Sequence, residues 1–179
     1  MSSARSAPPP RPAVFFDRDG TLNVDTGYVH RPEDLIFVAG AAAAVKRAND
    51  LGYYAFLVTN QSGVARGYYT EADVNAFHAH LQQQLRAAGA YLDDIRYCPY
   101  LPDAPVAAYS RDSGWRKPRP GMLLDLMRAW PVIAEKSFVV GDKAVDMQAA
   151  QAAGLRGLYF HGGDLDKFLA PHLDVMSHS

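Results

Sequence analysis

The stretch Ala13-Val14-Phe15-Phe16-Asp17-Arg18-Asp19-Gly20-Thr21 decides the fold class. Four apolar residues end abruptly at an aspartate, as a strand buried on both faces of a parallel sheet ends at its carboxyl edge. Similar apolar runs lie at residues 54–58, 137–140 and 158–160. Between them, periodicity predicts helices over residues 41–51, 71–88, 121–130 and 145–153. Alternating strands and helices indicate an α/β fold with a doubly wound, Rossmann-like parallel sheet.

The chain is expected to form one domain. About half of its 179 residues are apolar, which suffices for one core without disulfides. Residues 1–12 (MSSARSAPPPRP) hold almost nothing that could bury apolar surface, so we interpret them as a disordered Pro-rich tail before a single domain at residues 13–179. Residues 99–116 lack clear periodicity, and a loop that long is usually functional.

Composition excludes several classes of function. A net charge of -1 without blocks of like charge predicts no nucleic-acid partner and no membrane surface. No apolar run could span a bilayer, and prolines follow the basic N-terminus where a secretory signal needs an apolar core. The single cysteine, Cys98, suits a reducing compartment. We therefore expect a cytoplasmic monomer whose partner is a small molecule.

Polar residues follow three of the apolar runs. They are Asp17-Arg18-Asp19, Thr59-Asn60-Gln61-Ser62 and Asp142-Lys143. In a doubly wound sheet, ligands bind beyond the carboxyl ends of the strands, so these residues are predicted to share one site.

The two aspartates spaced D-x-D can perform phosphoryl transfer. Oxygen ligands from Asp17, from Asp142 and from a backbone carbonyl near Asp19 suit a partly hydrated Mg²⁺. An ionised Asp17 can attack phosphorus and form an aspartyl-phosphate. Asp19 can protonate the leaving oxygen and later take a proton from water.

Two further residues fit a phosphate site. Thr59 offers a hydroxyl donor, and Lys117, stiffened by the surrounding prolines, offers a fixed cation. Asp146 is expected to orient Lys143 or the metal waters. Taken alone, D-x-D-G-T can be a turn, Thr59 a helix cap and Lys117 a solvated charge; their conjunction in this order favours the site.

The motifs Asp17-x-Asp19-Gly20-Thr21, Thr59, Lys117 and Gly141-Asp142-x-x-x-Asp146 resemble the four motifs of the haloacid dehalogenase superfamily of phosphotransferases. The longer runs at residues 24–30 (VDTGYVH), 58–67, 116–122 and 141–150 resemble its heptose bisphosphate phosphatase family, over about residues 13–160. The resemblance implies the superfamily's fold with short loop insertions and no large cap domain. It also implies removal of a sugar 7-phosphate on the route to ADP-heptose of the lipopolysaccharide inner core.

The resemblance assigns roles to residues by position. It implies Asp17 as nucleophile, Asp19 as acid/base, Thr59 and Lys117 as phosphoryl-stabilising groups, and Asp17, Asp19 and Asp142 as the magnesium site. The implied substrate contacts are Asp25, Thr26, Gly27, Tyr28, Asn60, Gln61, Ser62, Arg116, Lys117 and Lys143.

One feature departs from the family pattern. Many relatives bind a structural zinc through C-x-H and C-x-C pairs, but these positions read Cys98-Pro99-Tyr100 and Ser113-Gly114-Trp115 here. One thiolate cannot hold a tetrahedral zinc, so structural zinc is predicted to be absent. Packing of Tyr100, Tyr109 and Trp115 is expected to hold the loop instead. Because His30, His78 and His80 lack metal-ligand spacing, we interpret them as structural or solvated.

Two alternative functions remain open. Histidinol-phosphate phosphatases share most of these motifs. A phospho-acceptor switch domain also combines a doubly wound sheet with an aspartate, Mg²⁺, a threonine and a lysine. Asp19 disfavours the switch, because a built-in acid/base lets the acyl-phosphate turn over.

Overall fold

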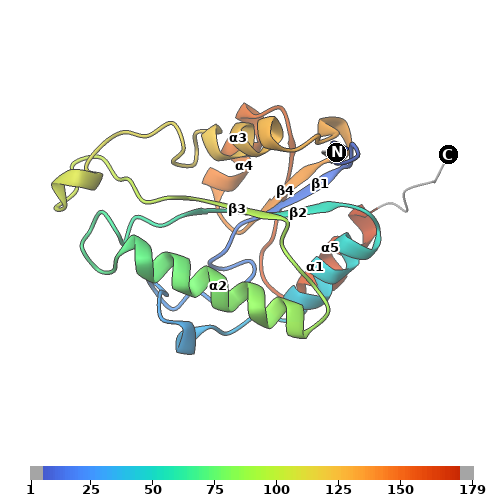
Figure 1. The fold of residues 1–179 in the computed structure, drawn as a ribbon, viewed down its shortest axis with the longest axis horizontal. Helices are drawn as coiled ribbons and strands as arrows, with labels where there is room; N and C mark the ends of the chain where they lie inside the picture. The colour runs from blue at the N-terminus through green and yellow to red at the C-terminus, as the bar shows by residue number, and fades with distance from the viewer. Residues whose placement is uncertain (1–5, 174–179) are drawn as a thin grey trace, which may run out of the picture.

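The computed structural model describes residues 6–173 and contains a five-stranded, all-parallel sheet (Figure 1). The strands are β1 (Ala13–Phe16), β2 (Tyr54–Asn60), β3 (Asp94–Cys98), β4 (Phe138–Gly141) and β5 (Arg156–Tyr159). Their spatial order is β3-β2-β1-β4-β5, so the chain leaves β1 on one side and returns to its other side with β4. The doubly wound sheet predicted from the sequence is thereby confirmed, and the ends of β1 and β4 mark the switch point where such sheets bind ligands.

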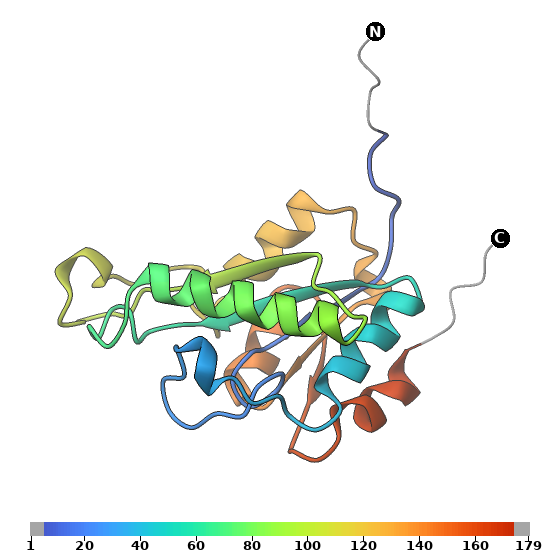
Figure 2. The same cartoon turned by 60° about the horizontal axis from the view of Figure 1, so that its bottom comes forward.

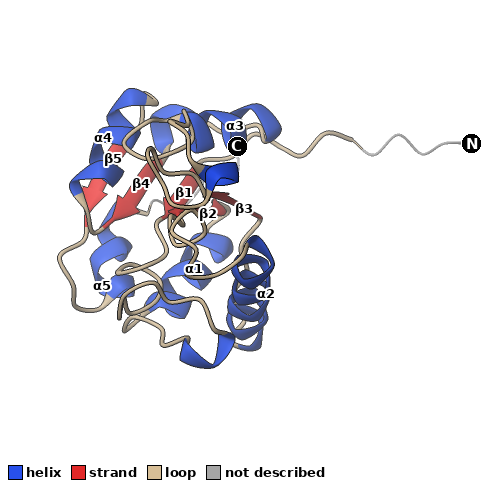
Figure 3. Ribbon diagram, turned by 90° about the vertical axis from the view of Figure 1, so that its left-hand side faces the viewer, coloured by secondary structure: helices blue, strands red, loops and turns tan. Residues whose placement is uncertain are grey.

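Helices cover both faces of the sheet (Figure 3). α1 (Ala41–Asp50), α2 (Glu71–Ala87) and α5 (Leu165–Leu169) pack on one face, and α3 (Gly121–Ala129) and α4 (Ala144–Ala152) pack on the other. The four longer helices match the predicted ones within one residue at each end. Short 3₁₀ turns lie at Pro32–Asp34, Ala107–Tyr109, Ala134–Lys136 and Ala170–His172.

The apolar run of β1 supplies both cores. Val14 and Phe16 point into the core under α1 and α2, whereas Ala13 and Phe15 point into the core under α3 and α4. All four side chains are fully buried. This two-sided burial explains why the strand reads as a continuous apolar run, and it fixes the position at which Asp17 leaves the sheet.

Two elements were not predicted. β3 carries Asp94 and Arg96 among its five residues, and its side chains are mostly half-buried because the strand lies at the sheet edge. α5 is only five residues long. Neither element shows the long apolar pattern by which the others were recognised.

Before β1, the chain is already attached to the domain. Residues 6–10 are exposed, but the Arg11 amide donates to the Pro131 carbonyl and the Tyr54 hydroxyl donates to the Pro9 carbonyl. Of the predicted tail, residues 9–12 therefore contact the fold, and residues 1–5 lie outside the described part.

Residues 99–116 form a long loop that protrudes beside the segment preceding α2 (Figures 1 and 2). The Val106 amide donates to the Ala65 carbonyl, which joins the two segments. Tyr100 and Trp115 pack against the core under α3, and Tyr109 packs against a small cluster around Tyr69. The predicted aromatic anchors of this loop are confirmed.

Candidate active site

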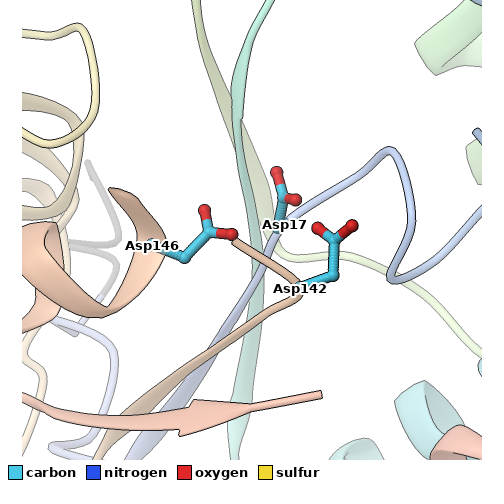
Figure 4. A group of neighbouring side chains, drawn as sticks. All are labelled: Asp17, Asp142 and Asp146. Atoms are coloured by element: carbon cyan, nitrogen blue, oxygen red, sulfur yellow. The ribbon is translucent and has the colours of Figure 1, made fainter. Parts of the chain in front are cut away.

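Three carboxylates gather at the switch point (Figure 4). Asp17 follows β1, Asp142 follows β4 and Asp146 lies in the first turn of α4, and one oxygen of each lies within 4.8 Å of the others. Gly20 is required beside them: its φ is 83°, and a Cβ there would clash with the Asp142 carboxylate. Among residues 6–173, this is the only such group of three potential metal ligands.

The electrostatics of the cluster favour a bound cation. Burial and contact with the Asp17 carboxylate raise the pKa of Asp142 from 3.8 to about 7. The Oδ1 atom of Asp142 is buried without a hydrogen-bond partner. Crowded, incompletely paired carboxylate oxygens are the ligands that a hard divalent cation such as Mg²⁺ prefers. The donor set therefore fits the predicted magnesium.

Lys117 supplies the fixed positive charge. Its Nζ donates to Asp17 Oδ1 at 2.8 Å, to Asp146 Oδ1 at 2.7 Å and to the Val58 carbonyl at 3.0 Å. Burial alone would lower the pKa of Lys117, but the two carboxylates outweigh burial and raise it above its usual value. The Asn60 side chain clamps the Lys117 backbone, accepting from its amide at 3.0 Å and donating to its carbonyl at 3.1 Å. The lysine is thus held as a permanent cation beside Asp17.

Asp146 binds Lys143 as expected, but through the backbone amide, and it also binds Lys117. Its Oδ1 binds the Lys117 ammonium, and its Oδ2 accepts from the backbone amide of Lys143 at 3.1 Å. The Lys143 ammonium instead lies 3.9 Å from Asp25 Oδ2. Asp146 therefore orients Lys117 and caps α4, while the side chain of Lys143 reaches toward the rim of the site.

The carboxylate of Asp19 stands apart from the three-aspartate cluster. Its Oδ1 accepts from Arg18 and from Asn23 Nδ2, and its Oδ2 accepts from Gln61 Nε2 at 3.1 Å. The predicted magnesium contact of Asp19 is made by its backbone carbonyl, so it does not need the Asp19 carboxylate to lie beside Asp17, Asp142 and Asp146. The side chain is thereby left available for proton transfer.

A cavity of about 410 Å³ opens in front of these groups. It gathers residues from the predicted substrate set, namely Asp25, Gly27, Tyr28, Asn60, Gln61, Ser62, Arg116, Lys117 and Lys143, together with Asp19. Thr26 is not among the lining residues, and Thr59 lies beneath the surface with 1% of its area exposed. Tyr69 and Val145 also line the cavity. Sequence reasoning missed both, because Tyr69 lies outside the strand-end motifs and Val145 reads as an ordinary helical residue.

Arg116 combines burial with free hydrogen-bonding capacity. It lines the cavity next to Lys117, and its Nη1 atom is buried without a partner. The side chain of Lys143, which directly precedes α4, is 57% exposed. The cavity therefore holds one buried cation against Asp17 and two further cations available to a second anionic group.

The remaining predicted features are structural. His78 is buried, its Nε2 lies 3.2 Å from Arg18 Nη1, and burial with Arg18 lowers its pKa to about 3. Cys98 is buried, and burial raises the pKa of its thiol.

In the described part of the chain, no helix is long and apolar enough to cross a membrane.

Known proteins resemble the chain along most of its length. A family model described as HAD-hydrolase-like matches residues 114–171. D-glycero-beta-D-manno-heptose-1,7-bisphosphate 7-phosphatase of Rhodopseudomonas palustris is 48% identical over 90% of this chain and 89% of its own. The enzyme of that name from Escherichia coli K12 is 42% identical over 80% of this chain and 75% of its own.

Solved structures agree with this assignment. The D,D-heptose 1,7-bisphosphate phosphatase of B. bronchiseptica, in complex with magnesium and phosphate, has a TM-score of 0.76 and 34% identity, covering 89% of this chain and 86% of its own. The corresponding phosphatase of Burkholderia thailandensis has a TM-score of 0.60 and 27% identity, covering 90% and 85%. The chain therefore belongs to the D-glycero-D-manno-heptose-1,7-bisphosphate 7-phosphatase family of HAD-like hydrolases, and is a phosphoric monoester hydrolase.

Proposed function

We propose that the protein removes the 7-phosphate of D-glycero-D-manno-heptose 1,7-bisphosphate, a step toward the ADP-heptose of lipopolysaccharide. The observation that carries the proposal is the arrangement of cations around the cavity. The Lys117 ammonium lies against Asp17, while the side chains of Arg116 and Lys143 line the same cavity and form no salt bridge with the three-aspartate cluster. A substrate with one phosphate at the nucleophile and a second one further along the cavity satisfies this arrangement.

Magnesium is proposed to bind through Asp17, Asp142 and the backbone carbonyl of Asp19. The B. bronchiseptica neighbour was solved with magnesium, and in this chain burial and the nearby Asp17 carboxylate raise the pKa of Asp142, so a cation between the two carboxylates would relieve their repulsion. When bound, the ion neutralises charge on the phosphoryl oxygens.

Phosphorylation of the enzyme is the first chemical step. A carboxylate oxygen of Asp17 attacks phosphorus in line, forming an O–P bond while the bond from phosphorus to the sugar C7 oxygen breaks. Asp19 donates its proton to that departing oxygen. Lys117 stabilises the negative charge carried by the phosphoryl group, because its ammonium is held against Asp17 before substrate arrives, and the buried Thr59 is proposed to contribute its hydroxyl.

Hydrolysis of the aspartyl-phosphate completes the cycle. Water attacks phosphorus, Asp19 takes the proton of that water, and the bond between Asp17 and phosphorus breaks to release inorganic phosphate. Asp19 returns to its protonated state and Asp17 to its carboxylate. Arg116 is proposed to hold the 1-phosphate during the first step, with Lys143 as a weaker, more exposed contact; the heptose 1-phosphate then leaves and makes room for the attacking water.

A steady-state comparison of two substrates tests the proposal. We expect kcat/KM for the heptose 1,7-bisphosphate to exceed that for histidinol phosphate by about 10- to 100-fold, because the latter leaves Arg116 unpaired. Equal or faster turnover of histidinol phosphate would contradict it. The named relatives do not favour that alternative or a phospho-acceptor switch.

A further inference from the structure

Both N–H donors of the Gln61 side-chain amide form hydrogen bonds within the protein. Its Nε2 donates to Asp19 Oδ2 at 3.1 Å and to Thr59 Oγ1 at 2.9 Å, and its Oε1 accepts from the Tyr69 hydroxyl at 2.6 Å. A primary amide has two N–H donors, so neither is left for a substrate. Only 2% of the residue is exposed. Gln61 therefore lines the cavity without a free side-chain donor for a phosphate oxygen.

Tyr69 fixes the direction in which this amide faces. A reversed amide would turn its oxygen toward the Asp19 carboxylate, placing acceptor against acceptor. The Tyr69 hydroxyl favours the observed orientation because it donates to Oε1. Gly63 makes room for it, since a Cβ at this position would clash with the ring and hydroxyl of Tyr69.

Arg18 holds the other oxygen of Asp19. Its Nε and Nη2 donate to Oδ1 at 3.1 and 2.9 Å, and Asn23 Nδ2 donates to the same atom at 3.0 Å. Arg18 is fully buried, and Nη2 also donates to the Val29 carbonyl at 2.5 Å. Its guanidinium lies 4.3 Å from the centre of the Phe77 ring. This locked fork keeps the carboxylate from rotating.

The two oxygens of Asp19 are consequently unequal. Oδ1 accepts from three donors, whereas Oδ2 accepts from Gln61 alone among the described residues. Oδ2 thus keeps the capacity to carry and transfer a proton, and Asp19 lines the cavity into which a leaving oxygen would come.

We propose that Gln61 and Arg18 are positioning residues that hold Asp19 so that its Oδ2 exchanges a proton with the leaving oxygen. This inference rests on the proposed function, in which Asp19 is the acid/base. It reassigns Gln61, which the family resemblance placed among the substrate contacts. In this role Gln61 acts through Asp19, to which one of its two amide N–H groups donates.

Substrates that differ in leaving group test this role. The Gln61→Ala variant should lose about 10- to 100-fold in kcat/KM on the heptose bisphosphate, whose alkoxide must be protonated as it leaves. It should lose less than about 3-fold on p-nitrophenyl phosphate, whose phenolate departs without a proton. kcat/KM is the informative parameter because it covers the steps through leaving-group departure. Gln84→Ala, an exposed glutamine on α2, should leave both values unchanged.

A double-mutant cycle with Asp19→Asn separates positioning from a structural effect. If Gln61 acts through Asp19, Gln61→Ala should cost no further activity once Asp19 is asparagine. Gln61→Met, which keeps the side-chain volume, should repeat the result if alanine lowers Tm. Arg18→Lys, which keeps the charge but loses the fork, should show the same leaving-group dependence.

Two results would overturn the inference alone: an equal loss on both substrates, or the full loss of Gln61→Ala persisting in the Asp19→Asn background. A third result has a different meaning. If Asp19→Asn itself shows no leaving-group dependence, the acid role of Asp19 in the proposed function fails, and the inference fails with it.

Discussion

Replacing Arg116 with alanine tests how the enzyme holds one phosphate while removing the other. Arg116 lines the cavity, and its Nη1 atom is buried without a partner, so a bound phosphate would meet an unpaired, poorly solvated donor. A charge-assisted hydrogen bond of this kind contributes about 1.5–3 kcal/mol, or about 10- to 100-fold in kcat/KM. Lys143 is 57% exposed, so its alanine variant should lose less than about 5-fold.

The assay compares heptose 1,7-bisphosphate with heptose 7-phosphate, which share one leaving group. Arg116→Ala should lose the stated factor on the bisphosphate and far less on the monophosphate, because only the former has a 1-phosphate to be held. Arg119→Ala is the matched control, since Arg119 is 51% exposed and pairs with Asp112 away from the cavity. If both substrates fall by the same factor, Arg116 serves the chemical step or the fold, and the account of positional selectivity is wrong.

Three further outcomes follow from the site and its loop. The pKa of Asp142 in the folded protein is raised from 3.8 to about 7, so the metal-free protein should lose stability as pH rises between these values. Mg²⁺ should raise Tm more at about pH 8 than at about pH 5, because the carboxylate is ionised at the higher pH. Equal Tm shifts at the two pH values would contradict the assignment of Asp142 to the metal site. Protein purified without added zinc should carry no stoichiometric zinc by elemental analysis, and Cys98→Ser should cost little activity; one zinc per chain would reveal ligands not recognised in the sequence. Glu71 accepts from the hydroxyls of Tyr97 and Tyr109 at 2.7 and 2.8 Å. Glu71→Gln should therefore lower Tm by about 2–8 °C and raise KM, because it loosens the loop that carries Arg116. Unchanged Tm and KM would show that packing alone holds the loop.

The fold was predictable where buried strands leave a continuous apolar run. β1 extends over the four residues expected, because each of its side chains enters one of two cores. β3 escaped prediction because its side chains at the sheet edge are mostly half-buried, so Asp94 and Arg96 can pair with each other there and with Trp130 and Asp125. A continuous apolar run marks a fully buried strand, and β3 has no such run because it is only partly buried.

The membership of the site was more predictable than its internal contacts. Asp17 and Asp142, at two strand ends, and Lys117, in the segment before α3, lie together as expected. The ion pair of Asp146 was not foreseen: sequence adjacency suggested Lys143, which contributes only its backbone amide, whereas the fold brings the Lys117 ammonium to Asp146. The contact between Tyr69 and Gln61 likewise depends on how the segment before α2 folds back, which no local motif specifies.

Trapping the covalent intermediate tests the central claim, that Asp17 is the nucleophile, most directly. The Asp19→Asn variant should still accept a phosphoryl group from p-nitrophenyl phosphate, slowly, but hydrolyse it poorly because it lacks the base that activates water. After incubation with Mg²⁺, acid quenching and borohydride reduction, peptide mass spectrometry should find homoserine at position 17. The Asp17→Asn variant should show neither the label nor turnover. Reduction at another residue, or near-normal turnover by Asp17→Asn with Mg²⁺ present, would contradict the account.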